Sequence, residues 1–348
     1  MTNPVAIDGS AGGGQILRNA VALSAVSGRP VQVTNIRGAR PQPGLRPQHL
    51  MAVGAAAAAC QARLIGAEIG SREIEFWPGQ VETMVDRRLD VGTAGSLTLV
   101  LQCLLPALAY APAESSLTLI GGTDVPFAPP FDYFQQVFCP GLAEIGVRVD
   151  ARLIMRGCYP KGGGEVQVRI SPSATIQPIS WVERGQVERV RGLSFSLGLP
   201  GHITQRMRDS ALSVLAVAGY REAEVELEVV ASGRSEGCGI ALWAECEGGR
   251  RFGGSALGRR GRRAEQVGEE AARALLAELD SVAAVDTHLA DQLMVWLALA
   301  RGPSEFTTAR ATDHLRSAAQ VAESLLGARI QIEAGPPTRV LCRPPTPL

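Results

Sequence analysis

Four histidines are the side chains of this sequence best suited to covalent chemistry, and they stand at positions 49, 202, 288 and 314. An imidazole ring is a competent nucleophile towards phosphorus. His314 lies in ATDHLRSAAQVAE at an expected helix start, and His288 precedes Asp291 and Gln292 in HLADQL. A single histidine is more often structural than catalytic, so both interpretations stay open for each.

Arginines gather just before His49 in IRGARPQPGLRPQHL, and Arg18 lies on the first expected helix. The forked guanidinium group matches the oxygens of a phosphate. The cluster therefore predicts a phosphate site, with a solvated basic loop as the alternative. Its three arginines are Arg37, Arg40 and Arg46, of which Arg46 is also a candidate contact to a nucleic acid.

A second basic run, RRFGGSALGRRGRR, occupies residues 250–263. Arg259 and Arg260 in this run are candidate contacts to a nucleic-acid backbone, and an exposed basic turn is the alternative. Lys161, the only lysine among the 34 basic residues, is followed by glycine. A Walker A loop needs Gly-Lys followed by serine or threonine, so the sequence has no such loop.

Glycine-rich loops recur at expected helix starts: AGGGQ at 11–15, GTAGS at 92–96 and GGTD at 121–124. A helix start offers unpaired N–H groups and the positive end of the helix dipole, which suit a bound phosphate. Gly13, Gly14 and Gln15 are therefore candidates for phosphate binding. A tight turn between a strand and a helix is the alternative for any one loop.

Short β-rich runs alternate with helical runs of about 12–16 residues along the first half of the chain. The alternation predicts a helix-and-strand unit of about 40 residues used repeatedly, and hence a layered α/β fold with internal repeats. The expected strands are 4–8, 30–36, 72–78, 116–122, 147–154 and 162–172, and the expected helices are 15–28, 47–62, 97–111 and 129–146.

The pattern changes near residue 183 and returns after about residue 285, which predicts an inserted domain. We expect a large discontinuous α/β domain at 1–183 and 281–340, and a smaller inserted α/β domain at 184–280. Residues 334–348 are rich in proline, and we expect residues 341–348 to be a partly unstructured tail.

Composition narrows the classes of protein to consider. The formal net charge is zero, so bulk attraction does not make this chain a general polyanion binder. The seven cysteines contain no CxxC pair and predict buried free thiols rather than a zinc site. No segment is typical of a transmembrane helix or a signal peptide, so we expect a cytoplasmic protein without a membrane partner.

Taken together, the motifs resemble those of the RNA 3'-terminal phosphate cyclases, in order and over nearly the whole chain. The matching segments are GGGQILR, QPGLRPQHL, GTAGSLTLVLQ, GGTDVPFAPP, YPKGGGEV, GSALGRRG, LADQLMVWLALARG and the histidine of ATDHLRSAAQVAE. The resemblance implies a large domain of three repeated α/β units with a small α/β domain inserted. It leaves a homodimer open.

The resemblance also implies a reaction in three steps, with ATP and an RNA 3'-phosphate end as substrates. A histidine attacks the α-phosphorus of ATP, which gives a covalent histidine–AMP and releases pyrophosphate. The AMP then passes to the RNA 3'-phosphate. The neighbouring 2'-hydroxyl attacks this activated phosphate, so that a 2',3'-cyclic phosphate forms and AMP leaves.

Roles for named residues follow from the same resemblance. His314 matches the family's nucleophile. Phosphate contacts are implied for Arg18, Arg37 and Arg40, with a divalent metal, Mg²⁺ or Mn²⁺, helping pyrophosphate to leave. Further positions around the nucleotide and the nucleophile match His49, Gln102, Asp291 and Gln292.

Two positions depart from the family pattern. Ala11 stands where the family usually has a metal-binding glutamate, and the loop is two residues shorter. The change implies weaker metal binding, a different metal preference, or a shift of the role to Asp8 or to ATP alone. His288 stands where the family often has an aromatic side chain that packs on the nucleotide. Two rival interpretations stay open: a catalytically silent relative that serves ribosome assembly, and an enzyme like the enolpyruvyl transferases, which share the repeated unit.

Overall fold

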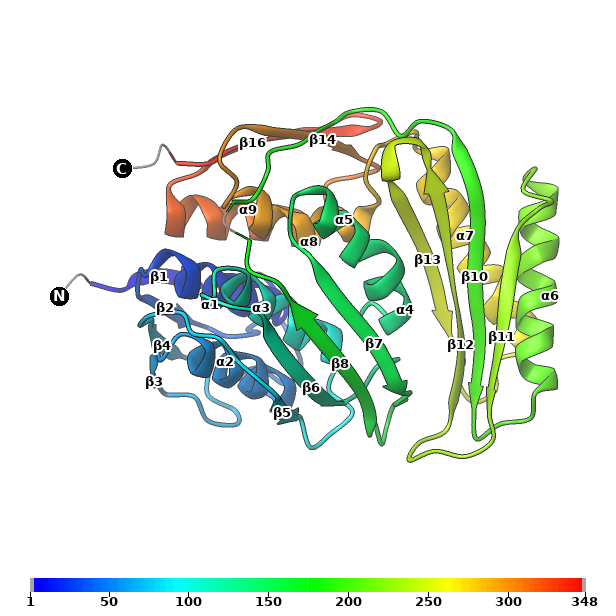
Figure 1. Cartoon of the computed structure of the whole chain (residues 1–348), viewed down its shortest axis with the longest axis horizontal. Helices are drawn as coiled ribbons and strands as arrows, with labels where there is room; N and C mark the ends of the chain where they lie inside the picture. The colour runs from blue at the N-terminus through cyan, green and yellow to red at the C-terminus, as the bar shows by residue number, and fades with distance from the viewer. Residues whose placement is uncertain (1–2, 174, 346–348) are drawn as a thin grey trace.

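The computed structural model describes residues 3–173 and 175–345. Its strands form four mixed sheets of four strands each, and helices cover them, so the expected α/β class is confirmed. Figure 1 shows the three sheets built from the two ends of the chain and, on the right, the sheet built from its middle.

One β-α-β-α-β-β unit is used three times. The first unit is β1 (Val5–Asp8), α1 (Gln15–Ser27), β2 (Val31–Thr34), α2 (Pro47–Ala59), β3 (Arg63–Ile65) and β4 (Ile74–Trp77). The second is β5 (Arg87–Asp90), α3 (Leu97–Ala109), β6 (Ser115–Gly121), the helical run α4 (Phe131–Tyr133), η1 (Phe134–Phe138) and α5 (Cys139–Glu144), β7 (Val149–Met155) and β8 (Gly164–Ile170). The third is β9 (Ser180–Trp181), α8 (Thr287–Leu297), β14 (Ser304–Thr308), α9 (Asp313–Leu326), β15 (Arg329–Glu333) and β16 (Thr338–Arg343).

Each unit has the same strand order, in which the fourth strand lies between the second and the third. The first two strands of each unit pair in parallel and the remaining pairs are antiparallel. The three repeated units are therefore confirmed. The expected repeat of about 40 residues is too short, because each complete unit contains two helical segments rather than one.

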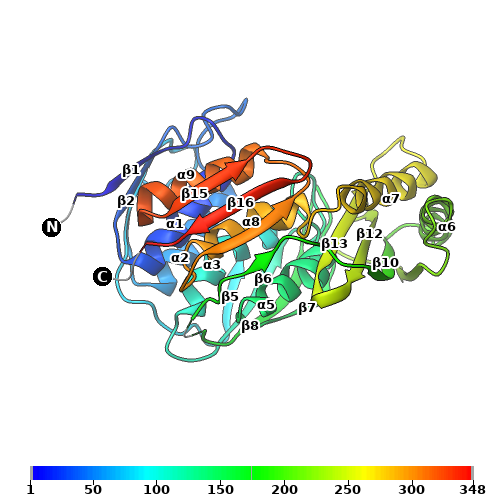
Figure 2. The ribbon, with the colours of Figure 1, turned by 90° about the horizontal axis from the view of Figure 1, so that it is seen from above.

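The middle of the chain interrupts the third unit between β9 and α8. It contains β10 (Val187–Leu197), α6 (His202–Val217), β11 (Glu224–Val230), β12 (Gly237–Cys246), η2 (Glu247–Gly249), β13 (Arg251–Leu257) and α7 (Ala264–Asp280). Its sheet has the order β11-β10-β12-β13, and α6 and α7 enclose a separate hydrophobic core with it. Figure 2 shows this part projecting to one side of the three units.

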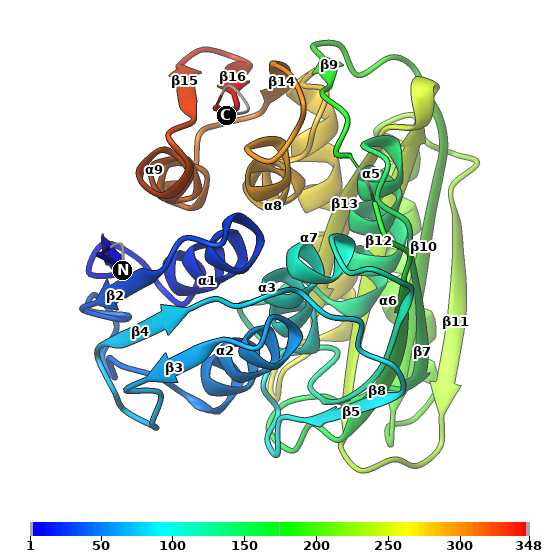
Figure 3. The same cartoon turned by 60° about the vertical axis from the view of Figure 1, so that its left-hand side comes forward.

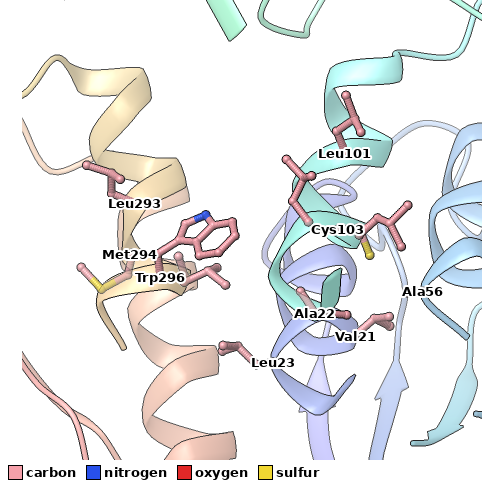
Figure 4. Close-up of a cluster of buried hydrophobic side chains, with 14 of the residues drawn as sticks. Val21, Ala22, Leu23, Ala56, Leu101, Cys103, Leu293, Met294 and Trp296 are labelled. Atoms are coloured by element: carbon pink, nitrogen blue, oxygen red, sulfur yellow. The ribbon is translucent and has the colours of Figure 1, made fainter. Parts of the chain in front are cut away.

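Helix α1 lies at the centre of the three-unit body. It packs against α2, α3, α8 and α9, and Figure 3 shows it between α8 and α9 on one side and α2 and α3 on the other. Side chains from α1, α3 and α8, among them Leu23, Cys103 and Trp296, meet in one buried core (Figure 4). This arrangement brings the starts of helices from different units close together.

The expectation of a partly unstructured tail was wrong for residues 341–343, which form the end of β16, while residues 344–345 form neither helix nor strand. This strand lies between β14 and β15, and Val340 and Cys342 are buried in the core. Prolines on both sides hid a short strand whose inward side chains alternate with exposed ones. The remaining part of the expected tail, residues 346–348, lies outside the described residues.

Two further expectations concern thiols and membranes. All seven cysteines are free and six are buried, so the expectation of buried free thiols is confirmed. Among the helices of the described residues, none is both long enough and apolar enough to cross a membrane.

Candidate active site

A cavity of about 240 Å³ lies where α1 and α9 begin. Two helix N-termini therefore point their unpaired N–H groups and positive dipole ends at one space, which favours an anion. Side chains and backbone from three segments line it: Ala11, Gly12, Gly13, Gln15, Ile16, Ala39, Arg40, Asp313, His314 and Ser317. Four of the predicted site residues, Gly13, Gln15, Arg40 and His314, thus share one cavity.

His314 is partly exposed at this cavity, in the first turn of α9. Partial desolvation lowers the pKa of its imidazole, and the positive charges of Arg18 and Arg40 lower that pKa further, while the neighbouring carboxylate of Asp313 opposes the shift. The side-chain amide of Gln15 donates a hydrogen bond of 3.2 Å to the His314 carbonyl and so ties the start of α1 to that of α9. The ring is therefore held in its neutral form, which has a lone pair for attack.

The start of α9 is fixed by a chain of two hydrogen bonds. The Thr312 hydroxyl caps the helix by accepting from the Leu315 N–H at 2.9 Å, and it donates to the carboxylate of Asp291. Burial raises the pKa of Asp291 to about 7. Asp291 therefore acts on His314 through Thr312, by positioning the helix turn that carries the histidine.

The glycines before α1 leave room for His49 and Arg18. A Cβ on Gly14 would lie 2.1 Å from Nε2 of His49 and 3.0 Å from Nη1 of Arg18. On Gly13 it would lie 3.1 Å from Nη2 of Arg40. The bare backbone is thus needed because polar side chains approach it closely.

Arg18 is a buried cation with no carboxylate partner among the described residues. Only 8% of its surface is exposed, and its Nε finds no hydrogen-bond partner there. Burial lowers its pKa to about 10, so the guanidinium stays charged at neutral pH. A buried, unpartnered charge is costly, and an anionic ligand would compensate for it.

His49 stands beside Arg18 as a neutral ring. Burial, followed by the charges of Arg18, Arg37 and Arg46, lowers its pKa to about 3. Its Nδ1 accepts a hydrogen bond of 3.3 Å from the Arg46 backbone N–H. This bond leaves Nε2 as the protonated nitrogen, so His49 can donate a hydrogen bond beside Gly14.

Arg37 is held by its own loop. Its Nη1 donates to the carbonyls of Gln42 and Gly44, at 2.7 and 2.9 Å, and its backbone has a positive φ of 57°. Burial and the charges of Arg46 and Arg40 lower the pKa of Arg37. The positive charges of Arg37, Arg40 and Arg46 repel one another and form a compact positive region beside His49.

Gln102, Gln292 and His288 form a second row of predicted site residues. Gln102 donates to the side-chain oxygen of Gln292 at 2.8 Å, and Gln292 donates to the His288 carbonyl at 2.9 Å. The exposed His288 ring stands edge-on to Tyr133, with ring centroids 6.1 Å apart. Gln292 and His288 lie on α8 with Asp291, whereas Gln102 lies on α3. None of the three lines the His314 cavity.

Arg259 and Arg260 lie elsewhere. They line a hollow of about 1020 Å³ at the start of α7, with Arg262, Gln266 and Arg273 among their neighbours. No residue of this hollow lines the His314 cavity. The structure thus keeps this basic run apart from the predicted nucleophile.

The three glycine-rich loops differ in structure. The loops at 11–15 and 92–96 lead into α1 and α3, as expected. The expectation of a helix start was wrong for residues 121–124, which follow β6 and precede α4 by several residues. A Cβ on Gly122 would lie 2.5 Å from the Ala94 carbonyl oxygen, so this glycine permits two loops to touch.

The described residues do not fit a metal ion held by the protein alone. Within residues 3–173 and 175–345, no three His, Cys, Asp or Glu side chains gather as a metal site. Ala11 lines the cavity where the resemblance implies glutamate. Asp8 keeps a lowered pKa, but its carboxylate accepts hydrogen bonds from Ser10 and Asn35 and does not line the cavity.

Sequence reasoning missed Thr312, which positions His314. The signal was available, because a threonine just before a helical run is a preferred N-cap. It also missed Ser317, which lines the cavity and donates to the His314 carbonyl at 3.0 Å. No sequence signal marks Ser317.

This arrangement can bind a phosphate chain and attack it. Arg18 and Arg40 and two helix starts supply positive charge, and His314 supplies an accessible neutral nucleophile. The arrangement is therefore suited to nucleotidyl or phosphoryl transfer.

Comparison with known proteins places these residues in context. A family model described as "RNA 3'-terminal phosphate cyclase" matches residues 10–332. A protein of that name from Pyrobaculum neutrophilum is 44% identical over 335 residues, which cover 95% of this chain and 96% of the relative. Another from Archaeoglobus fulgidus is 46% identical over 331 residues, covering 94% and 98%.

Among solved structures, the enolpyruvyl transferase NikO from Streptomyces tendae aligns with 98% of this chain and 48% of its own chain. The TM-score is 0.39 and the sequence identity is 12%. Values this low assign neither a fold nor an activity.

Proposed function

The chain belongs to the RNA 3'-terminal phosphate cyclase family, and from this premise we propose that it converts an RNA 3'-phosphate end to a 2',3'-cyclic phosphate with ATP. The observation that carries the proposal is the His314 ring, whose pKa is lowered, beside Arg40 in a cavity between two helix starts. A nucleophile that must attack a polyanion needs this combination.

The first step forms a covalent intermediate on His314. A ring nitrogen attacks the α-phosphorus of ATP, the bond to the β-phosphate oxygen breaks, and pyrophosphate leaves. Arg40 lines the cavity together with His314, and Nη1 of Arg18 lies 3.0 Å from the potential Cβ of Gly14 at the start of α1, so both guanidinium groups can stabilise the charge on the phosphates. Gln15 ties the start of α1 to the start of α9, and Thr312 caps α9.

The second and third steps use the energy of the histidine–AMP bond. An oxygen of the RNA 3'-phosphate attacks the AMP phosphorus, and the bond to His314 breaks. The 2'-hydroxyl of the same ribose then attacks the 3'-phosphorus, loses its proton and expels AMP. The hydroxyl is already attached beside its target, so this closure gains the advantage of an intramolecular reaction.

The divalent metal, Mg²⁺ or Mn²⁺, is proposed to arrive with ATP. Magnesium in nucleotide sites is commonly held by substrate phosphates and few carboxylates. Support comes from the lack of an acidic or histidine cluster among the described residues and from Ala11 at the cavity. No step above is assigned to the ion.

The activity is tested on an oligoribonucleotide with a 3'-phosphate, incubated with ATP and either Mg²⁺, Mn²⁺ or EDTA. The proposal expects a product resistant to phosphatase, with AMP and pyrophosphate formed in equal amounts. An RNA with a 2'-deoxy terminal sugar should be adenylylated but not cyclised. A protein that binds this RNA yet never consumes ATP would be a silent relative, and the proposal would fail.

A further inference from the structure

Two aromatic side chains are unusually exposed on loops next to each other. Phe127 is 97% exposed and Tyr159 is 64% exposed. Phe127 also has a positive φ of 65°, a conformation that bulky residues rarely adopt. Such strain is typical of functional positions, and the hydrophobic core gains nothing from a ring in water.

Backbone contacts join the two loops that carry these rings. The loop from 121 to 130 bridges to the turn from 156 to 163 between Asp124 and Cys158. The N–H of Thr123 donates to the Gly157 carbonyl at 2.9 Å. The loops that carry the two rings therefore lie side by side and form one surface region.

Positive charge lies on the same surface. Lys161 is exposed two residues after Tyr159. A Cβ on the nearby Gly163 would lie 3.0 Å from Cβ of Arg234, so this turn contacts the segment that carries Arg234. Arg234 is exposed on the turn between β11 and β12. Among the described residues, neither Lys161 nor Arg234 has a carboxylate partner within salt-bridge distance. Figures 1 and 3 show the β7–β8 and β11–β12 turns side by side at the lower edge.

A chain of contacts leads from this surface to the loop before α1. A Cβ on Gly162 would lie 2.7 Å from Cα of Ala94, so the turn rests on the loop at 92–96. That loop is bound in turn by the side chain of Gln48, which accepts from the Ser96 N–H at 3.0 Å. Gln48 is the sequence neighbour of His49, which reaches Gly14.

We infer that Phe127 and Tyr159 stack on bases of the RNA strand upstream of its 3'-phosphate end, while Lys161 and Arg234 contact its backbone. The inference rests on the proposed function, since it assigns the path of that substrate away from the cavity. Exposed rings beside unpartnered cations are the features with which proteins bind single-stranded nucleic acid. The arrangement accounts for YPKGGGEV and GGTDVPFAPP, two motifs that the His314 cavity leaves unused.

The charges on this surface favour RNA over a protein partner. An interface with a protein would need a larger apolar patch, whereas here two separate rings stand among basic and glycine-rich turns. Arg259 and Arg260 lie at the same end of the inserted sheet, because Leu257 pairs with Gly239 close to the β11–β12 turn. They would extend the basic surface for a longer strand.

The test measures RNA affinity without ATP, by fluorescence anisotropy of a 3'-phosphorylated hexaribonucleotide and a matching dinucleotide. Phe127→Ala and Tyr159→Ala should each weaken hexanucleotide binding by about five-fold or more. Tyr159→Phe, which keeps the ring, should bind like the wild type. Lys161→Ala and Arg234→Ala should each lower the slope of log affinity against log salt by about 0.7.

Two surface variants serve as controls. Val217 is 90% exposed on α6, and Arg148 is exposed at the other end of β7, so Val217→Ala and Arg148→Ala should leave affinity unchanged. The inference would be overturned if Phe127→Ala and Tyr159→Ala still bound the hexanucleotide more tightly than the dinucleotide by the wild-type ratio. It would also be overturned if the wild-type protein bound both RNAs equally well. The proposed function is tested separately, by ATP-dependent labelling of wild-type protein. If ATP does not label the wild-type protein but RNA binding still depends on the two rings, the proposed chemistry is wrong and the assigned RNA-binding surface is supported.

Discussion

At the scale of single residues, the protonation state of His314 governs the proposed chemistry, because only the neutral imidazole can attack phosphorus. Desolvation and the nearby arginine charges lower its pKa below the ordinary value of 6.5. The neutral form therefore persists as the pH falls below 6.5, and the nucleophile stays active in mildly acidic solution.

We predict that the labelling rate at saturating ATP declines on the acid side only below pH 6.5. Arg40→Gln removes a positive charge that lowers the His314 pKa, so the decline should move to higher pH. The exposed Arg148→Gln variant is the matched control and should keep the wild-type profile. A wild-type decline centred at or above 6.5, or no movement in Arg40→Gln, would contradict this account.

At the scale of elements, the loop before α1 depends on the absence of a side chain at Gly14. Gly14 has an ordinary helical backbone, with φ of −74°, so a substitution there tests space rather than strain. Gly54 in α2 offers a control, because nothing lies within 4 Å of its potential Cβ and it does not line the cavity.

Gly14→Ala should lower the labelling rate by about ten-fold or more, because displacement of His49 and Arg18 disturbs phosphate positioning. Overpacking should also cost about 1–3 kcal/mol of unfolding free energy. Gly54→Ala should leave the labelling rate unchanged and should not lower the unfolding free energy. If the two variants had equal effects on urea denaturation and on the labelling rate, a clash with His49 would not explain the defect of Gly14→Ala.

The N-cap of α9 gives a second prediction at this scale. Thr312→Ala should cost about 1 kcal/mol in unfolding free energy and slow labelling, because both the cap and the bond to Asp291 are lost. Without that bond, the pKa of Asp291 should rise further above about 7. Thr312→Ser keeps the hydroxyl and should behave as the wild type. A fully active Thr312→Ala protein would remove Thr312 from the site.

The sequence predicted the long amphipathic helices well and several short strands not at all. Helix α9 has a threonine cap, a glycine end and a buried face, each visible in the sequence. Strand β5, with the sequence RRLD, is an exposed edge strand, so no hydrophobic alternation marks it. The two residues of β9 carry no pattern at all, because the parallel partner β14 defines that strand.

Some residues of the candidate site could be predicted from sequence motifs, and others could not. Gly13, Gln15, Arg40 and His314 were identified from motifs, and the structure gathers them in one cavity. The roles assigned to them stay predictions. Phe127 and Tyr159 could not be singled out, because exposure is a property of the folded chain.

At the scale of the whole molecule, one buried ion network joins the second unit to the inserted part. Arg156 pairs with Asp132 through two hydrogen bonds, of 2.9 and 3.1 Å, and with Glu228 of β11 at 2.8 Å. Its guanidinium also lies 4.1 Å from the centre of the Phe195 ring in β10. The surface shared by Tyr159 and Arg234 depends on this junction.

Arg156→Met should lower the unfolding free energy by about 3–5 kcal/mol, because Asp124 and Asp132 lose the charge that compensates for their burial. Arg148→Met, on the surface, should change it by less than about 0.5 kcal/mol. Guanidinium denaturation measures both. If Arg156→Met were as stable as the control, the network would not hold the two parts together. A homodimer and a cytoplasmic location stay predictions.

The most direct test of the central claim is covalent labelling with ATP radioactive at the α-phosphate. The account predicts that label stays on the wild-type protein, is lost in acid and survives alkali, as a histidine–AMP bond requires, and is absent from His314→Ala. Label on both proteins would mean that another residue is the nucleophile. No label on a folded wild-type protein, with either Mg²⁺ or Mn²⁺, would contradict the proposed chemistry.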